Sequence, residues 1–168
     1  MATDYMYNIR KELKKHLPKD RKYVVGVSGG SDSVALALAM DAECYDFLAV
    51  VVDHQLQDDS EHFSEYARLL MSDYNIPCII HKVDVNVTNT GVEDAARTAR
   101  YEALFSHGEN LVIGHTKNDQ AETVLLGFQQ GSGSSALAGM RIVSEHERGA
   151  IYRPMLENIT KEGTQKAC

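Results

Sequence analysis

The residues best suited to chemistry form a short run of serines, glycines and one aspartate: Ser28, Gly29, Gly30, Ser31, Asp32 and Ser33. A β-branched stretch before this run predicts a buried strand, and the apolar-periodic stretch after it predicts a helix. The two glycines allow a tight turn whose N–H groups approach a ligand at the positive end of that helix. The run therefore predicts a cradle for phosphate or pyrophosphate. A plain turn between a strand and a helix is the alternative.

Two polar residues, Asp53 and His54, come directly after the apolar run that ends at Val52. At the end of a strand they are placed to contact the base or the ribose of a nucleotide. A carboxylate at this position can also simply cap the next turn, so the pair alone does not establish a binding site.

Arg97 and Arg100 lie three residues apart, and Tyr101 lies four residues after Arg97, so all three share one face of a predicted helix. Two guanidinium groups placed in this way can bind phosphate bidentately. The alternative is an ion-paired surface turn that involves Glu93 and Glu102.

The segment from Gly114 to Thr123 carries the second strong signal, because it follows a predicted strand and opens a helix. Asp119 and Glu122 are three residues apart and share a face, and His115 lies in the loop before them. Paired carboxylate oxygens near a phosphate cradle are what Mg²⁺ requires when it shares its coordination shell with a nucleotide. Ordinary helix capping by acidic residues in a first turn is the alternative.

The elements that must position these residues alternate along the chain. Strands are predicted at residues 23–27, 47–52, 78–83, 110–114 and 151–153, and helices at residues 5–17, 33–43, 60–74, 92–106 and 118–130. Strands separated by helices of this size predict an α/β fold with a doubly wound, parallel, five-stranded sheet of the Rossmann-like type. In such sheets ligands bind beyond the carboxyl ends of the strands, where the serine-glycine run, Asp53 and Gly114 all fall.

The chain of 168 residues has the length of one domain, which we expect to span residues 1–168, with a basic helix within residues 1–22 and a short tail at 157–168. No apolar run approaches the length of a membrane span, and the N-terminus lacks an apolar signal core. Three unpaired cysteines predict a reduced, cytoplasmic protein, with Cys44 and Cys78 as small buried side chains.

The net charge of −7 disfavours a broad nucleic-acid surface, but the charge is unevenly distributed. Residues 10–22 contain seven basic and two acidic residues, whereas the rest of the chain contains 10 basic and 22 acidic residues. This basic segment could meet a phosphate backbone, or it could be a solvated helix face.

Six motifs follow one another in a fixed order: S-G-G-x-D-S, V-D-H-x-L, E-x-x-A-R-x-x-R-Y, H-x-x-x-D-Q-x-E-T, G-S-G-x-x-x-L-x-G-M and R-P-M-L. The set resembles the N-terminal catalytic domain of the tRNA(Ile)-lysidine synthetase family, which are PP-loop ATP pyrophosphatases. The resemblance covers about residues 20–158, nearly the whole chain.

This resemblance implies an ATP-dependent ligase that activates C2 of a tRNA wobble cytidine, releases pyrophosphate and joins free lysine to form lysidine. It implies ATP and Mg²⁺ as cofactors and a phosphate site at residues 28–33. It also implies contacts with the nucleotide or RNA from Asp53, His54, Arg97, Arg100 and Gly114. By the same resemblance, the catalytic residues would be Asp32, His115, Asp119 and Glu122. The residues that bind the metal ion would be Asp32, Asp119 and Glu122.

The chain departs from the family pattern at Gln57 and Gln130, where arginines would touch phosphate. Gln55 replaces a glycine of the pattern, and Asn118 replaces a carboxylate. The sequence therefore predicts tRNA binding that is weak for this chain alone, and it leaves open a homo-oligomer or a separate RNA-binding partner. Two alternatives to lysidine formation remain: adenylation of another small or RNA substrate, and a non-catalytic nucleotide-binding domain.

Overall fold

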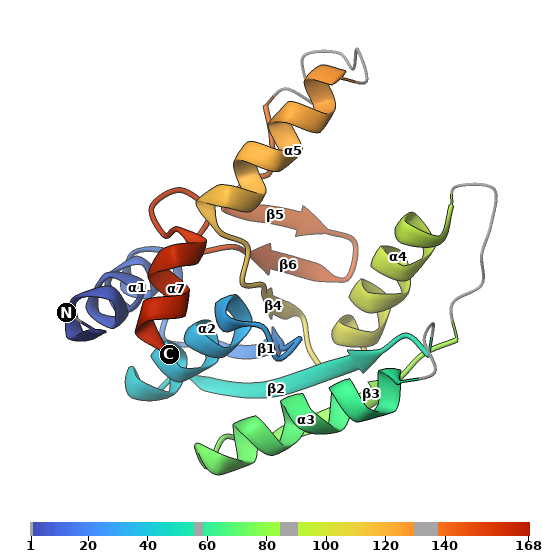
Figure 1. The fold of residues 1–168 in the computed structure, drawn as a ribbon, viewed down its shortest axis with the longest axis horizontal. Coiled ribbons are helices and arrows are strands. Elements are labelled where there is room, and N and C mark those ends of the chain that lie inside the picture. Colours follow the sequence, from blue (N-terminus) through green and yellow to red (C-terminus); the bar gives the residue numbers. More distant parts are fainter. Residues whose placement is uncertain (1, 56–58, 85–90, 130–137) are drawn as a thin grey trace.

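The computed structural model describes residues 2–55, 59–84, 91–129 and 138–168, and Figure 1 shows strands and helices alternating along the chain. The strands are β1 (Lys22–Gly26), β2 (Asp46–Asp53), β3 (Cys78–Lys82), β4 (Asn110–Val112), β5 (Val143–His146) and β6 (Gly149–Tyr152). The helices are α1 (Ala2–His16), α2 (Ser31–Ala42), α3 (Ser60–Asp73), α4 (Val92–Phe105), α5 (Lys117–Gln129) and α7 (Lys161–Ala167).

All six strands belong to one sheet in the order β3-β2-β1-β4-β6-β5. Five strands run parallel, and β5 pairs antiparallel with β6 as its hairpin partner. The predicted α/β class with a doubly wound sheet is confirmed, but the sheet has six strands rather than five. The sequence gives little sign of β5, because Val-Ser-Glu-His is short and mostly polar, as an exposed edge strand can be.

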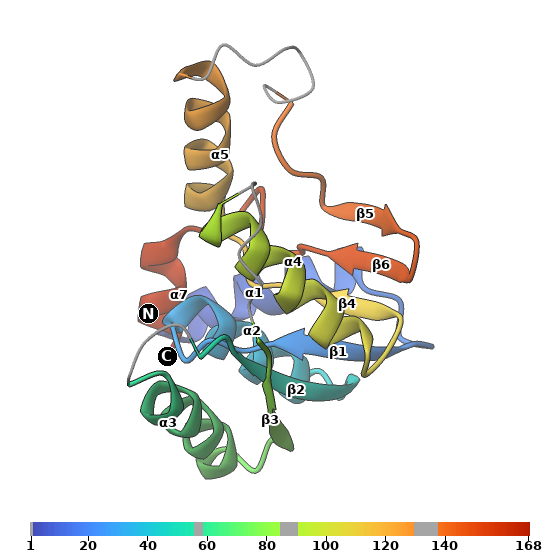
Figure 2. The ribbon, with the colours of Figure 1, turned by 90° about the vertical axis from the view of Figure 1, so that its right-hand side faces the viewer.

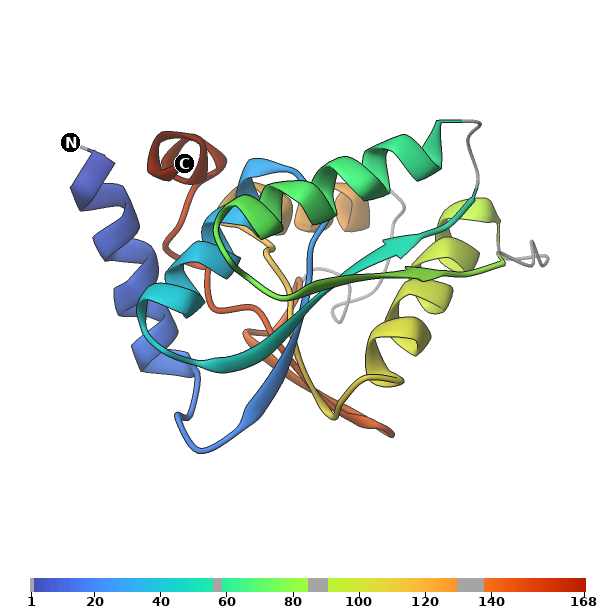
Figure 3. The same ribbon diagram turned by 90° about the horizontal axis from the view of Figure 1, so that it is seen from below.

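The period of two along the central strands separates the core into two layers. Val25, Val27, Ala49 and Val51 pack against α1, α2, α3 and the C-terminal segment on one face of the sheet. The alternate side chains of β1 and β2 pack against Leu104 and other residues of α4 on the opposite face. Figure 3 shows this separation, with α4 across the sheet from α2 and α3. Each fully buried valine stabilises the fold by about 1.5–3 kcal/mol.

The last twelve residues form a packed element rather than the short tail expected from the sequence. Ile159 is buried, and Thr160 begins α7 by accepting a hydrogen bond from the N–H of Gly163 at 3.1 Å. Figure 1 shows α7 beside α1 and α2. The side chain of Thr164 is fully buried and donates a hydrogen bond to Asp32, so this segment reaches the predicted phosphate loop.

The cysteines do not all lie where the sequence predicts. Cys44 is exposed, because it occupies the turn after α2 with a φ of 55°, so the prediction of a buried side chain is wrong there. Cys78 is half-buried, and burial raises the pKa of its thiol to about 11.

Helix α5 rises away from the sheet, as Figures 1 and 2 both show. Leu125, Leu126 and Phe128 on its outer part are exposed. Neither α5 nor any other helix in the described ranges is long and apolar enough to cross a membrane.

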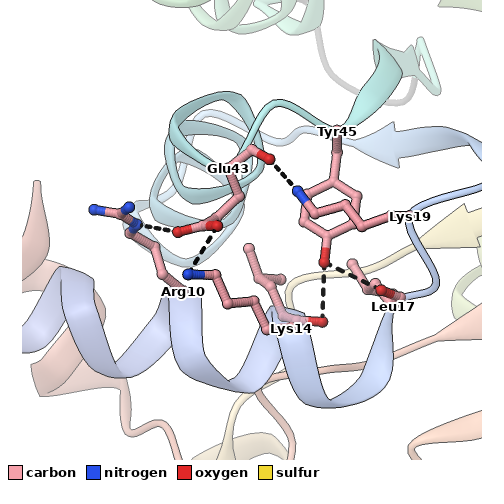
Figure 4. A network of polar contacts seen from close by, with 7 residues as sticks. Arg10, Lys14, Leu17, Lys19, Glu43 and Tyr45 are labelled. Atoms are coloured by element: carbon pink, nitrogen blue, oxygen red, sulfur yellow. Dashed lines mark hydrogen bonds and ion pairs between the residues drawn. The ribbon is translucent and has the colours of Figure 1, made fainter.

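Basic side chains of the N-terminal segment form ion pairs and hydrogen bonds with a neighbouring residue, Glu43 (Figure 4). The side chain of Glu43 is only 8% exposed, and its two oxygens lie 2.6 Å from Arg10 Nε and 3.0 Å from Lys14 Nζ. Lys19 donates to the Glu43 carbonyl and lies over the Tyr45 ring. The Tyr45 hydroxyl in turn bonds to two carbonyls at the end of α1. This network joins α1 to the end of α2.

Candidate functional site

The serine-glycine run forms a closed loop between β1 and α2. Gly29 has a φ of 80°, and a Cβ atom there would lie 3.2 Å from that of Ala67, so a side chain would be both strained and crowded. The Ser33 hydroxyl donates to the Gly30 carbonyl at 3.0 Å and accepts from the Ser28 N–H at 3.1 Å. These bonds hold the loop in shape at the N-terminus of α2, where backbone dipoles favour an anion.

The loop between β4 and α5 lies directly against this phosphate loop. A Cβ atom on Gly114 would come within 3.1 Å of the Asp32 carbonyl oxygen, so any side chain there would crowd the two backbones. Thr116 then begins α5, and Asp119 accepts hydrogen bonds from its N–H at 2.6 Å and from its hydroxyl at 2.8 Å. The carboxylate is thus fixed by helix capping, and it also lines the cavity described below.

Asp53 and His54 lie at the carboxyl end of β2. Asp53 is 2% exposed, and its Oδ1 accepts a hydrogen bond from the Gln55 N–H at 3.0 Å. The buried Nδ1 of His54 has no hydrogen-bond partner within the described part of the chain. Burial lowers the pKa of His54, and the nearby charge of Arg100 lowers it further, while Asp53 opposes both.

His115 is the most strongly perturbed of the predicted site residues. Burial, and after it the charge of Arg153, lowers the pKa of His115 to about 4. Asp119 opposes this shift, while Arg100 and Arg97 add to it. His115 is therefore a neutral imidazole at physiological pH, and none of the described residues bonds with its buried Nδ1.

These elements enclose a cavity of about 550 Å³ at the carboxyl ends of β1, β2 and β4. Strands β2 and β4 flank β1, so the cavity lies where the order of the sheet reverses direction, which is the usual ligand site of such folds. Nine of the predicted site residues line it: Ser28, Asp32, Ser33, Asp53, His54, Arg100, Gly114, His115 and Asp119.

The other predicted residues lie outside the lining of this cavity. Gly29, Gly30 and Ser31 shape the loop and the start of α2, and Arg97 lines a separate cavity. Glu122 is exposed on α5 and lines neither cavity.

The three carboxylates expected to bind one metal ion do not come together. Across residues 2–55, 59–84, 91–129 and 138–168, no three His, Cys, Asp or Glu side chains gather as a metal site. Asp119 and Glu122 share a helix face by spacing, but Asp119 turns back to cap Thr116. Asp32 and Asp119 both line the cavity, and two carboxylates suffice for Mg²⁺ when nucleotide phosphates supply further ligands.

Sequence reasoning missed several residues of the site. Ser60, Phe63 and Ser64 of α3 line the cavity at helical spacing, a pattern that reads equally well as an ordinary helix face. Arg153, in the R-P-M-L motif, is only 5% exposed and lowers the pKa of His115. Five of the six buried side-chain atoms that lack a hydrogen-bond partner in the described ranges belong to His54, Arg100, Tyr101, His115 and Arg153. Three of them, His54, Arg100 and His115, line this cavity, where a polar ligand could satisfy them.

Comparison with known proteins agrees with this architecture. Residues 1–167 match the PP-loop domain family, and the chain belongs to that family. It is 37% identical over 161 residues to tRNA(Ile)-lysidine synthase of Haemophilus ducreyi, which covers 94% of this chain and 37% of that protein. It is 42% identical over 154 residues to tRNA(Ile)-lysidine synthase of Cutibacterium acnes, which covers 88% of this chain and 48% of that protein.

Among solved structures, the U34-tRNA thiolase NcsA of Methanococcus maripaludis with its [4Fe-4S] cluster is similar, with a TM-score of 0.76 and 19% identity over 98% of this chain and 64% of that chain. At this identity the likeness shows the fold alone. The chain spans less than half the length of the two lysidine synthases it matches.

Proposed function

We propose that this chain uses ATP to adenylate a tRNA base, releases pyrophosphate and thereby prepares the base for lysidine formation. One observation carries the proposal: a single cavity joins the phosphate loop to Asp119, Arg100 and His115 at the point where the sheet reverses its order. The names of the two bacterial relatives, tRNA(Ile)-lysidine synthase, supply the substrate and the product.

The loop of residues 28–33 would bind the phosphates of ATP through backbone N–H groups at the start of α2 and through the serine hydroxyls. Ser33 keeps this loop closed before ATP arrives, so little reorganisation is needed on binding. The other end of the cavity, at Asp53 and His54, would contact the nucleoside.

Asp32 and Asp119 would hold Mg²⁺ together with the phosphates. When bound, the ion would supply positive charge to the leaving pyrophosphate. Asp119 is suited to this role because its hydrogen bonds to Thr116 fix the carboxylate before the ion binds. Asp32 is similarly held by the hydroxyl of Thr164.

Arg100 would neutralise charge that develops on the phosphates, since its guanidinium reaches the same cavity from α4. His115 would act as a neutral hydrogen-bonding group, because a pKa of about 4 prevents it from adding another positive charge at physiological pH. Its unpartnered Nδ1 leaves one position for substrate.

The chemistry balances in two steps. The C2 oxygen of the cytidine attacks the α-phosphorus, the bond from that phosphorus to the bridging oxygen breaks, and pyrophosphate leaves with the electron pair. The ε-amine of free lysine then attacks C2, the bond from C2 to the adenylate oxygen breaks, and AMP leaves as the amine loses a proton. The required co-substrate is free lysine, and the location we propose is the cytoplasm.

An exchange assay between ATP and labelled pyrophosphate, run with and without tRNA and lysine, tests this proposal. Asp119→Asn keeps the size of the side chain and removes its charge, and Glu122→Gln is the matched control on the same helix. We expect Asp119→Asn to lower the exchange rate by about 100- to 1000-fold, as loss of one preorganised electrostatic partner does. The dissociation constant of ATP should change less than about tenfold, because the charge on pyrophosphate develops only as the bond breaks.

Glu122→Gln should leave exchange within about twofold of the unmodified protein, since Glu122 does not line the cavity. Equal losses in both variants would contradict the assignment of the two carboxylates. A folded and fully active Asp119→Asn protein would remove Asp119 from the site.

A further inference from the structure

A second cavity, of about 770 Å³, lies beside the first and has a different chemical character. Three arginines line it: Arg97 from α4, Arg141 from the segment before β5, and Arg153 after β6. The rest of the lining comes from residues 139–145, including Ser144 and Glu145. None of residues 28–33 contributes to it.

Two hydrogen bonds hold the guanidinium group of Arg153 in position. Its Nη1 donates to the Arg141 carbonyl at 3.0 Å and to the Ser144 hydroxyl at 2.8 Å. The residue is only 5% exposed, and its buried Nε has no hydrogen-bond partner among the residues that the structure describes. A buried charge with an unsatisfied donor is costly, so this geometry favours an acceptor that is supplied by a ligand.

The cavity carries a clear excess of positive charge in a protein whose net charge is −7. Three guanidinium groups face one carboxylate, Glu145. Among the ion pairs formed by the described residues, none includes Arg97, Arg141 or Arg153. The chemistry of the site is therefore that of an anion site, and arginines bind phosphate bidentately.

Arg97 and Arg100 are neighbours on α4, but each lines a different cavity. Arg100 lines the cavity of the phosphate loop, and Arg97 lines the second one. Both guanidinium carbons lie 5.8 Å from the centre of the Tyr101 ring, so the two charges are close. His115 of the first cavity senses the charges of Arg153 and Arg97, which also places the two sites side by side.

We propose that the second cavity binds a backbone phosphate of the RNA, next to the nucleotide whose base is activated in the first cavity. This inference rests on the proposed function. ATP has its own phosphate site at residues 28–33, so a phosphate bound by Arg97, Arg141 and Arg153 belongs to another ligand. A phosphodiester held there anchors the RNA strand while the base reaches the neighbouring cavity.

The test measures binding of a labelled anticodon stem-loop RNA by fluorescence anisotropy, in the absence of turnover, and the binding of ATP separately. Arg97→Gln and Arg141→Gln are suitable variants because both residues are exposed, so we expect their replacement to leave the fold intact. Arg148→Gln is the matched control, since this exposed arginine lies in the turn of the same hairpin and does not line the cavity.

We expect each cavity variant to weaken RNA binding about fivefold, the upper end of the range for an exposed ion pair. The slope of log affinity against log salt should fall by about one for each arginine removed. The dissociation constant of ATP should stay within about twofold, and Arg148→Gln should behave as the unmodified protein. An unmodified protein that does not bind the RNA, or cavity variants that bind it unchanged, would overturn the inference.

Two further outcomes separate the sources of the bound anion. Loss of ATP affinity in the cavity variants would assign the site to the phosphates of ATP and contradict the inference. Glu145→Gln should strengthen RNA binding about twofold by removing a repulsive carboxylate. If Glu145→Gln instead weakens binding of free lysine and leaves the RNA unaffected, the cavity is a site for an amino acid.

The two assays together distinguish a failure of this phosphate site from a failure of the proposed function. If the chain binds RNA through these arginines but shows no pyrophosphate exchange, the proposed activity is wrong and the phosphate site is supported. If it exchanges pyrophosphate normally and the arginine variants bind RNA unchanged, only the phosphate site is wrong.

Discussion

Two groups of basic residues in this protein contrast in what surrounds them. Residues 10–22 carry seven basic residues, and several of these pair with Glu12, Glu43 or Asp46. The group formed by Arg97, Arg100, Arg141 and Arg153 has fewer charges, yet none of them belongs to an ion pair with the described residues around them.

The difference shows that charge density along a sequence is a poor guide to where an anion binds. In the N-terminal segment, Arg10 and Lys14 join α1 to Glu43, so their charges stabilise the fold. The four arginines line two cavities. Burial lowers the pKa of His115, and Arg153, Arg100 and Arg97 lower it further. We therefore interpret the first group as structural and the second as functional.

The largest expected effect concerns His115, which responds to the arginine group. Its folded pKa of about 4 lies below the ordinary value of 6.5, so protonation favours the unfolded chain. Stability present at neutral pH is therefore lost as the pH falls from 6.5 toward 4, by about 3 kcal/mol. His115→Asn should remove most of this loss, measured as urea unfolding at several pH values. If the free energy of unfolding falls equally with pH in both proteins, the burial of a neutral imidazole at residue 115 is contradicted.

Arg100→Gln should lower pyrophosphate exchange about 100-fold, because one preorganised donor to the phosphates is removed. The matched control is Arg10→Gln, which removes the same charge from the N-terminal segment. This control should exchange pyrophosphate normally and unfold at a lower temperature. If Arg10 is instead needed for exchange and Arg100 for stability, the assignment of the first group to structure and the second to function is wrong.

Glu43→Gln should lower the midpoint of thermal unfolding at neutral pH. Hydrogen bonds from Lys14 and Arg10 lower the pKa of Glu43, so its stabilising contribution is present above about pH 4.5 and is lost as the pH falls through the lowered folded pKa. Below the lowered folded pKa of Glu43, the variant and the unmodified protein should therefore converge. Calorimetry over this range measures the difference, and a constant gap at all pH values would argue against an ionic cause.

The smallest effect is expected for RNA binding by the N-terminal segment. A protein carrying Lys14→Gln, Lys15→Gln and Lys22→Gln should bind the anticodon stem-loop RNA with less than a threefold change, roughly 0.6 kcal/mol. Lys22 and Asp46, for example, form an exposed pair 3.6 Å apart. A loss greater than that of the Arg97→Gln and Arg141→Gln double variant would place the RNA surface on α1 instead.

Much of the fold could be predicted from the sequence, because β1 and β2 contain runs of valine and helices such as α3 and α4 are amphipathic. Strand β5 could not, since its four residues are held by pairing with β6 rather than by their own pattern. Helix α7 was also missed, because its seven mostly polar residues are fixed by contacts with α1 and α2 that sequence does not reveal.

The site could be predicted in part for the same physical reasons. A tight turn before a helix needs glycine and serine at fixed positions, so the phosphate loop is visible in the sequence. Spacing places Asp119 and Glu122 on one face, but only the structure shows that Asp119 turns back to Thr116 and lines the cavity. Arg141 and Arg153 converge through tertiary contacts alone, and no local pattern could pair them with Arg97.

The central claim is that the cavity cleaves ATP between its α and β phosphates. ATP labelled at the γ-phosphate, incubated with the protein, Mg²⁺, tRNA and lysine, tests it most directly when the labelled product is identified by chromatography. We predict labelled pyrophosphate, with AMP as the other nucleotide product. Labelled orthophosphate together with ADP would contradict the account.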